Sequence, residues 1–152
     1  MEGQLINQED KNELSKLLSI MVHKFIVAYG KILDSDISGS QVYILEILTA
    51  DGAKKSSELS ERLGISLPAV TNLTNKLVQK GYIERKPSEN DRRITLMQIT
   101  LLGSEMLDQI NEKYFALTDS LWKDFSNEEL RDLHGYYKKM VDNLKEYKLD
   151  KE

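Results

Sequence analysis

The sequence predicts a mainly α-helical fold that carries one small β-hairpin, an α+β arrangement. Over most of the 152 residues, apolar side chains recur every three or four positions, as they do on the buried face of a helix. Between residues 82 and 99 this spacing gives way to two short runs typical of strands, with a polar loop between them. We therefore expect a helical lobe that ends in a hairpin, flanked by long helices.

A long amphipathic helix is predicted from Asp10, with apolar residues at helical spacing as far as Leu33, before the polar break at residues 34–36. The apolar face of this helix has more surface than a small neighbouring lobe would cover. A shorter helix follows, because Ser38 and Gln41 have the spacing of a capping box. This helix is expected to be buried and to be the first element of a lobe over residues 38–100. Its apolar residues are Val42, Ile44, Leu45, Ile47 and Leu48.

Two helices joined by a tight turn are predicted between residues 56 and 80. Ser56 or Ser57 is expected to cap the first helix, and Gly64 to end it in left-handed backbone. Ser66 is placed to cap the second helix, with Pro68 tolerated in its first turn. The core-facing residues of the second helix are Val70, Leu73 and Leu77, with Val78 beside them.

The exposed face of the second helix is short, polar and nearly free of negative charge, which suits the major groove of duplex DNA. Asn can pair with adenine, Ala and Thr methyl groups can touch the thymine methyl, and Lys can reach a phosphate or guanine. A merely solvated helix face is the alternative interpretation. The candidate contacts on these helices are Ser56, Ser57, Ser66, Ala69, Thr71, Asn72, Asn75 and Lys76.

A hairpin with a charged tip is predicted after Gly81, with strands over residues 82–86 and 93–99 and a turn over residues 87–90. Asp91 and Arg93 are two residues apart, so on extended backbone they would share a face and the carboxylate could hold the guanidinium. An Arg held in this way can enter a narrow minor groove. An ordinary exposed ion pair is the alternative. The candidate contacts here are Lys86, Ser88, Asp91, Arg92 and Arg93.

Two more helices are predicted beyond Gly103, the second starting at the capping box of Ser126 and Glu129. Apolar residues of the last helix alternate at spacings of three and four, as along a coiled-coil seam. They are Leu130, Leu133, Tyr137, Met140, Leu144 and Tyr147. Residues 8–34 and 103–150 are therefore expected to form a dimerisation region. Packing of these helices on one another as a monomeric bundle is the alternative.

Charge is unevenly distributed along the chain. Residues 54–93 hold nine Lys and Arg against five Asp and Glu, a balance of +4, whereas the whole chain is at −4. A basic middle on an acidic remainder is typical of a module that binds nucleic acid. The sequence therefore favours double-stranded DNA as the partner.

Composition also excludes several classes of protein. The chain has no Cys, so disulfides, thiolate zinc sites and cysteine redox sensing are excluded. It has no signal pattern and no apolar run of the roughly 20 residues that cross a bilayer, so a cytoplasmic protein without membrane contact is expected. No catalytic motif or cofactor loop is found, and no enzyme is predicted. His23 and His134 have no further ligands at a clear spacing, so no metal is expected.

These motifs together resemble the MarR family of bacterial transcription regulators. The resemblance rests on the helix-turn-helix, on residues 80–85 (KGYIER), 91–93 (DRR) and 99–103 (ITLLG), and on the flanking helices. Ile99 stands where that family usually has Leu. The resemblance covers almost the whole chain and implies one winged helix-turn-helix domain over residues 1–152. It also implies an obligate homodimer that binds a palindromic operator and is usually released by a small ligand.

From this resemblance we expect a ligand-responsive regulator, most often a repressor in that family. Effectors of the family are often aromatic or phenolic anions that bind between the DNA-binding lobe and the dimer helices. Residues expected near that junction are Tyr29, Tyr43 and Met106. Two alternatives stay open: a winged-helix module that binds protein and has lost DNA contact, and a constitutive architectural DNA binder.

Overall fold

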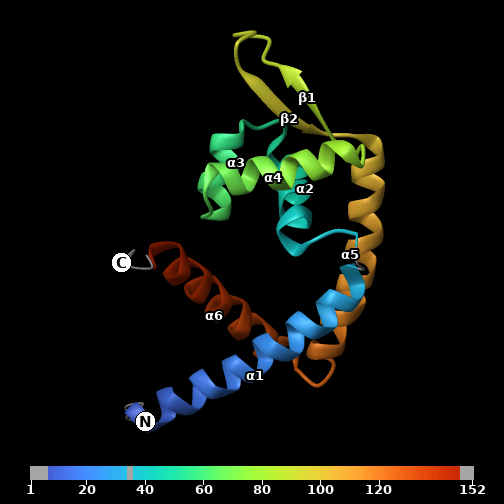
Figure 1. Ribbon diagram of the computed structural model, residues 1–152. Helices are drawn as coiled ribbons and strands as arrows, with labels where there is room; N and C mark the ends of the chain where they lie inside the picture. Colours follow the sequence, from blue (N-terminus) through green and yellow to red (C-terminus); the bar gives the residue numbers. More distant parts are fainter. Residues whose placement is uncertain (1–6, 34–35, 148–152) are drawn as a thin grey trace. The chain divides into compact units, whose positions relative to one another are not determined.

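The computed structural model describes residues 7–33 and 36–147 and shows a mainly helical chain with one antiparallel hairpin, as predicted (Figure 1). Its described residues form two compact units, one ending at Tyr114 and the other starting at Phe115. The elements of this part of the chain are α1 (Gln8–Leu33), α2 (Gly39–Asp51), α3 (Ser56–Leu63), α4 (Leu67–Gln79), β1 (Ile83–Pro87), β2 (Thr95–Ile99), α5 (Leu101–Trp122) and α6 (Asn127–Glu146).

Helix α1 has an apolar surface that its own unit leaves largely uncovered. Of its residues only Leu33 is buried. Eight large apolar side chains of α1 are exposed: Leu14, Leu17, Leu18, Ile20, Met21, Val22, Ile26 and Val27. Asp34 and Ser35, in the predicted break after this helix, lie outside the described residues, as do residues 148–150 of the predicted C-terminal region.

The core of the first unit is centred on α2. The predicted capping box is confirmed: Ser38 Oγ accepts a hydrogen bond from the Gln41 N–H at 3.3 Å, and Gln41 Oε1 accepts one from the Ser38 N–H at 3.0 Å. The Gln41 amide also donates to the Leu73 carbonyl at 3.4 Å, which links α2 to α4. All five predicted apolar residues of α2 are buried, and each such side chain contributes about 1.5–3 kcal/mol by leaving water.

The helix-turn-helix of α3 and α4 is confirmed, with one cap corrected. Neither Ser56 nor Ser57 caps α3; the cap is Lys55, whose backbone N–H donates to Glu58 Oε2 at 2.8 Å. Glu58 supplies the acceptor, so the helix starts one residue earlier than a Ser cap would place it. Gly64 ends α3 in left-handed backbone at φ 66°, and Ser66 caps α4 as predicted.

The hairpin of β1 and β2 forms the wing, which projects beyond α4 in Figure 1. Its strands pair from Ile83 opposite Ile99 to Pro87 opposite Thr95. The predicted turn over residues 87–90 is wrong, because Pro87 still pairs and the connection runs over residues 88–94. Lys54 attaches the wing to the loop before α3 through two backbone bonds with Met97, of 3.0 and 2.7 Å.

Helix α5 starts at Leu101, two residues before the predicted boundary, because Thr100 caps it. The Thr100 hydroxyl accepts from the Gly103 N–H at 3.1 Å and donates to the Gly81 carbonyl at 2.6 Å. A Cβ atom at position 103 would lie 2.0 Å from the Tyr82 carbonyl oxygen. Only glycine therefore lets α5 approach the start of the wing this closely.

The second unit contains the end of α5 and helix α6. Ser126 caps α6 through the predicted capping box with Glu129. The pKa of Glu129 is lowered mainly by the hydrogen bond from the Ser126 backbone N–H, and then by the one from the Ser126 hydroxyl. Trp122 packs edge-on against Phe125 and Tyr137, with ring centroids 6.3 Å apart in each pair. Four residues of the predicted seam are nevertheless exposed: Tyr137, Met140, Leu144 and Tyr147.

Candidate nucleic-acid interface

The exposed face of α4 carries the polar residues predicted for it, and Leu67 is also exposed in its first turn. Ser66, Thr71, Asn72, Asn75 and Lys76 are exposed, and Ala69 is half-buried. On the opposite face Val70 and Leu77 are buried as predicted, whereas Leu73 is only half-buried. The sequence prediction missed Thr74, which is fully buried. Its hydroxyl donates a hydrogen bond to the Thr71 carbonyl oxygen at 3.1 Å.

The structure adds Arg85 to this face. A guanidinium nitrogen of Arg85, on β1, donates a hydrogen bond to Asn75 Oδ1 on α4. Both side chains are exposed. The sequence carries no local signal for this contact, since the two residues are ten positions apart and belong to different elements. The contact joins the wing to the predicted reading surface of α4.

The tip of the wing carries the predicted pair of Asp91 and Arg93. Arg93 Nε donates to Asp91 Oδ1 at 3.1 Å and Nη2 donates to Oδ2 at 3.2 Å, so the pair has two points of contact. The backbone is not extended as predicted: residues 91–94 form a turn, closed by the Ile94 N–H on the Asp91 carbonyl at 2.9 Å. A third bond, from the Arg93 N–H to Asp91 Oδ1 at 3.0 Å, fixes this turn.

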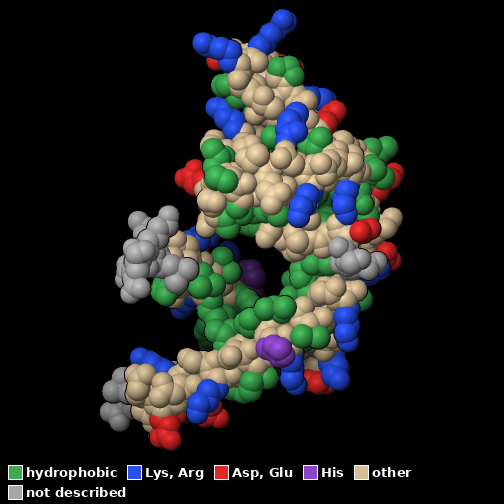
Figure 2. Space-filling model, in the orientation of Figure 1, with side chains coloured by type: hydrophobic (Ala, Val, Ile, Leu, Met, Phe, Trp, Pro, Cys, Tyr) green, Lys and Arg blue, Asp and Glu red, His purple; other side chains and the backbone are tan. Residues whose placement is uncertain are grey.

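The electrostatics of the tip follow from this geometry. Hydrogen bonds from the Arg93 side chain, and then from its backbone, lower the pKa of Asp91, and the charge of Lys55 lowers it further. Asp91 is therefore ionised at neutral pH. The Arg93 side chain is 91% exposed although it is held, which leaves its guanidinium free to meet a ligand. In Figure 2, Lys and Arg side chains stand out at the tip of the wing.

The other candidate contacts are near these two surfaces. Lys86, on β1, forms an ion pair with Glu84 at 2.8 Å, and both side chains are about half exposed. Ser88 is half-buried in the connection at the tip, and Arg92 is exposed there. Ser56 is half-buried and Ser57 exposed in the first turn of α3. All thirteen candidate DNA contacts thus lie on α3, on the segment from Ser66 through α4, or on the wing of the first unit.

The three residues predicted near a ligand lie on three different helices. Tyr29 of α1 packs against Phe25 and Tyr114, with ring centroids 6.1 and 5.6 Å away. Burial, and then the charge of Glu46, raises the pKa of Tyr29, and burial raises the pKa of Glu46 itself. Tyr43 is 47% exposed on α2, and Met106 of α5 packs partly buried against the core.

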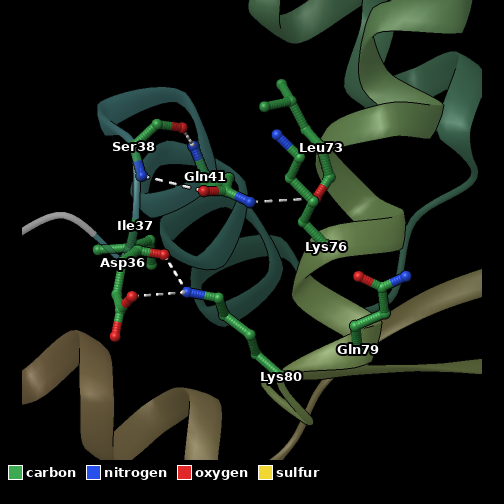
Figure 3. A pocket seen from close by; sticks show the side chains of 8 residues that line it. All are labelled: Asp36, Ile37, Ser38, Gln41, Leu73, Lys76, Gln79 and Lys80. Atoms are coloured by element: carbon green, nitrogen blue, oxygen red, sulfur yellow. Dashed lines mark hydrogen bonds and ion pairs between the residues drawn. The ribbon is translucent and has the colours of Figure 1, made fainter.

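A cavity of about 440 Å³ lies elsewhere, between the start of α2 and the second half of α4 (Figure 3). Lys80, which lines it, donates a hydrogen bond to the Asp36 carbonyl oxygen, and its Nζ lies 3.7 Å from the Asp36 carboxylate. None of the three predicted ligand residues lines it. Its lining residues are Asp36, Ile37, Ser38, Gln41, Leu73, Lys76, Gln79 and Lys80.

Within residues 7–33 and 36–147, no cluster of three His, Cys, Asp or Glu side chains could hold a metal ion. None of the helices seen in that part of the chain is both long and apolar enough for a membrane span.

The fold and the surface together define a winged helix-turn-helix DNA-binding protein. The model of the MarR family matches residues 37–95. The multiple antibiotic resistance protein MarR of Salmonella typhimurium is 30% identical over 107 residues, which cover 70% of this chain and 74% of that protein. The chain belongs to the MarR family of DNA-binding transcription regulators, which are not enzymes.

Two further proteins show how far the likeness extends. The HTH-type transcriptional regulator YpoP of Bacillus subtilis is 39% identical over 84 residues, 55% of this chain but only 60% of YpoP. The structure of a MarR family protein from Bacillus stearothermophilus superposes with a TM-score of 0.80 and covers 91% of this chain and 98% of that one, at 21% identity. At that identity the likeness shows the fold, including the long terminal helices.

Proposed function

We propose that the chain acts as a homodimer on a palindromic operator, represses transcription by occupying it, and is released by a small aromatic or phenolic ligand. The observation that carries the proposal is the combination of two surfaces. A polar helix face and a basic wing tip lie on one compact unit, while α1 and α6 carry large apolar surfaces that the described chain leaves exposed.

The DNA contacts follow from the chemistry of each surface. Helix α4 enters the major groove, where Thr71, Asn72, Asn75 and Lys76 meet base edges or phosphates. Arg93, oriented by Asp91, enters the flanking minor groove, where the negative potential is deepest. The residues that meet the sugar-phosphate backbone are Ser56, Ser57, Ser66, Lys86, Ser88 and Arg92, with Ala69 against a base methyl.

The dimer is supported by the exposed apolar side chains of α1 and α6. Leu14, Leu17 and Ile26 are 57–64% exposed on α1, and Leu144 and Tyr147 are 71% and 67% exposed on α6 or at its end. An apolar surface of this extent usually marks an interface. Two-fold symmetry would place two α4 helices about 34 Å apart, one turn of DNA.

Ligand response is proposed as a population shift. A ligand that binds better to a dimer whose α4 helices are out of step with successive grooves lowers DNA affinity, by no more than its preference between the two states. The proposed site lies near Tyr29, Tyr43 and Met106, at the side of α2 that faces α1. The Tyr29 ring approaches this side, since its Cε1 lies 3.5 Å from the Cβ position of Gly39.

The test uses purified full-length protein. We expect light scattering to give the mass of a dimer at micromolar concentration, and fluorescence anisotropy to show one dimer per palindromic duplex. Leu144→Glu, at a position 71% exposed on α6, should yield monomers that bind this duplex at least tenfold more weakly. A monomeric wild type that still binds the palindrome tightly would overturn the dimer, and phenolic ligands that bind without changing DNA affinity would overturn the release mechanism.

A further inference from the structure

The contact between α4 and β1 bears on which base α4 reads. An Asn side chain without another partner can pair bidentately with adenine. Its amide oxygen then accepts from the N6 amino group, and its amide nitrogen donates to N7. Here the amide oxygen of Asn75 already accepts a hydrogen bond from Arg85. We infer that Arg85 is a specificity-determining residue, whose guanidinium competes for the Asn75 oxygen and places further donors beside it, so that the pair selects guanine over adenine. This inference rests on the proposed placement of α4 in the major groove.

The orientation of the Asn75 amide follows from chemistry. A guanidinium has five N–H donors and no acceptor, so only an oxygen can stand against it. Rotating the amide by half a turn would bring two donors together and lose the bond. Because the Arg85 donor is charged, its bond is stronger than one between neutral groups. The amide N–H groups of Asn75 therefore remain for the partner.

The position of Arg85 is fixed by the wing. Ile83, two residues earlier and so on the same face of β1, is only 2% exposed and belongs to the core. Arg85 therefore extends from the face of β1 that packs on the first unit. It pairs across the hairpin with Met97, which Lys54 holds from the other side through two backbone bonds. Arg85 thus meets Asn75 from a rigid strand.

The charge of Arg85 then discriminates between bases. Adenine and cytosine present an amino group in the major groove, and this donor would have to share the Asn75 oxygen with Arg85 while lying beside its positive charge. Guanine presents two acceptors, O6 and N7, which can take one bond from Asn75 and one from Arg85. The pair therefore prefers guanine, and the guanidinium strengthens the preference.

The experiment compares variants of the full-length protein on duplexes selected from a randomised library and then changed one base at a time. The position read by Asn75 is the one whose base preference changes in Asn75→Ala. Wild type should prefer guanine there by about tenfold or more. In Arg85→Met, which keeps the aliphatic stem, the preference should move to adenine; Arg85→Ala provides a second test. Thermal unfolding checks that each variant is folded.

Arg92→Ala is the matched control, since it removes the same charge from the wing away from α4. It should weaken binding to all duplexes alike and leave the guanine preference in place. A wild-type preference for adenine, or an Arg85→Met preference unchanged from wild type, would overturn the inference while the groove placement stands. An equal loss on all duplexes in Arg85→Met would make Arg85 a phosphate contact. If Asn75→Ala and Asn72→Ala changed no base preference, the placement of α4 itself would fail.

Discussion

Asp91 holds Arg93 at two points at the tip of the wing, Nε to Oδ1 at 3.1 Å and Nη2 to Oδ2 at 3.2 Å, inside a turn in which the same carboxylate also accepts from the Arg93 N–H. The guanidinium is therefore oriented before it meets DNA, although its side chain is 91% exposed. Fixing a side chain in advance lowers the entropy that binding must remove. With the proposed DNA contacts, this relationship would let the wing contribute to affinity separately from the face of α4.

Arg93→Ala should weaken binding to every duplex by about tenfold. It should also reduce the slope of log affinity against log salt concentration by about one per protomer, because each protomer then brings one positive side chain fewer to the DNA. Asp91→Asn keeps the cation and loses only its fixed pose. It should therefore weaken binding less and leave the salt slope nearly unchanged. Anisotropy titrations at several salt concentrations measure both quantities. An unchanged affinity and slope in Arg93→Ala would show that the wing does not contact DNA.

Asn72→Ala should behave in the opposite way. Asn72 is exposed on α4 and carries no charge, so its loss should relax the preference at one base position by about fivefold or more. The salt slope should stay at its wild-type value, because no phosphate contact is lost. Binding to single-base variants of the operator measures the effect. A uniform loss over all bases would instead place Asn72 against the DNA backbone.

The contact between Asp91 and Arg93 should lose its stabilising effect when the pH falls, and not when it rises. The pKa of Asp91 is lowered, chiefly by the hydrogen bonds that the Arg93 side chain donates. A lowered folded-state pKa means that the stabilisation is present above the ordinary Asp value of about 3.9 and is lost as the pH falls through the lowered value. Carbon NMR of the Asp91 carboxyl group should give a midpoint below 3.9. In Arg93→Ala the midpoint should rise toward 3.9, and an identical midpoint in both proteins would contradict the assigned cause.

Gly103→Ala should destabilise the first unit. The added Cβ would lie 2.0 Å from the Tyr82 carbonyl oxygen, and neither backbone can yield without moving the start of α5 or the wing. Overpacking of this kind costs about 1–3 kcal/mol. The neighbouring Ser104→Ala adds no atom and should leave the unfolding free energy within about 0.5 kcal/mol of wild type. Urea unfolding measures both, and equal stabilities for the two variants would show that α5 does not pass so close to Tyr82.

Local chemistry was predictable from the sequence. The capping boxes at Ser38 and Ser126, the left-handed turn at Gly64 and the pairing of Asp91 with Arg93 all depend on residues within a few positions of one another. The same holds for the buried stripe of α2, since helical spacing alone identifies it. Most of the fold could therefore be predicted.

The errors and omissions have separate physical causes. Ser56 and Ser57 matched the cap preference, but Glu58 satisfies the Lys55 N–H and sets the start of α3 there. The wing connection starts one residue later than predicted, because Pro87 still pairs as the last residue of β1. It ends two residues later than predicted, because the turn over residues 91–94 keeps Arg93 and Ile94 out of β2.

Long-range contacts could not be predicted from spacing. Arg85 reaches Asn75 only once the wing folds back on α4. Likewise, the burial of Thr74 depends on how α4 packs in the lobe. Both features belong to the candidate interface, where contacts between elements decide the geometry.

We expect two copies of the α4 face and wing tip to fit successive grooves of one duplex. Selection of binding sites by the full-length protein from randomised duplexes measures whether they do. The recovered sites should share an inverted repeat whose half-site centres lie about 10 base pairs apart, with the flanking minor groove rich in A·T. Recovered duplexes that share only a single unpaired half-site, or no common sequence, would contradict it.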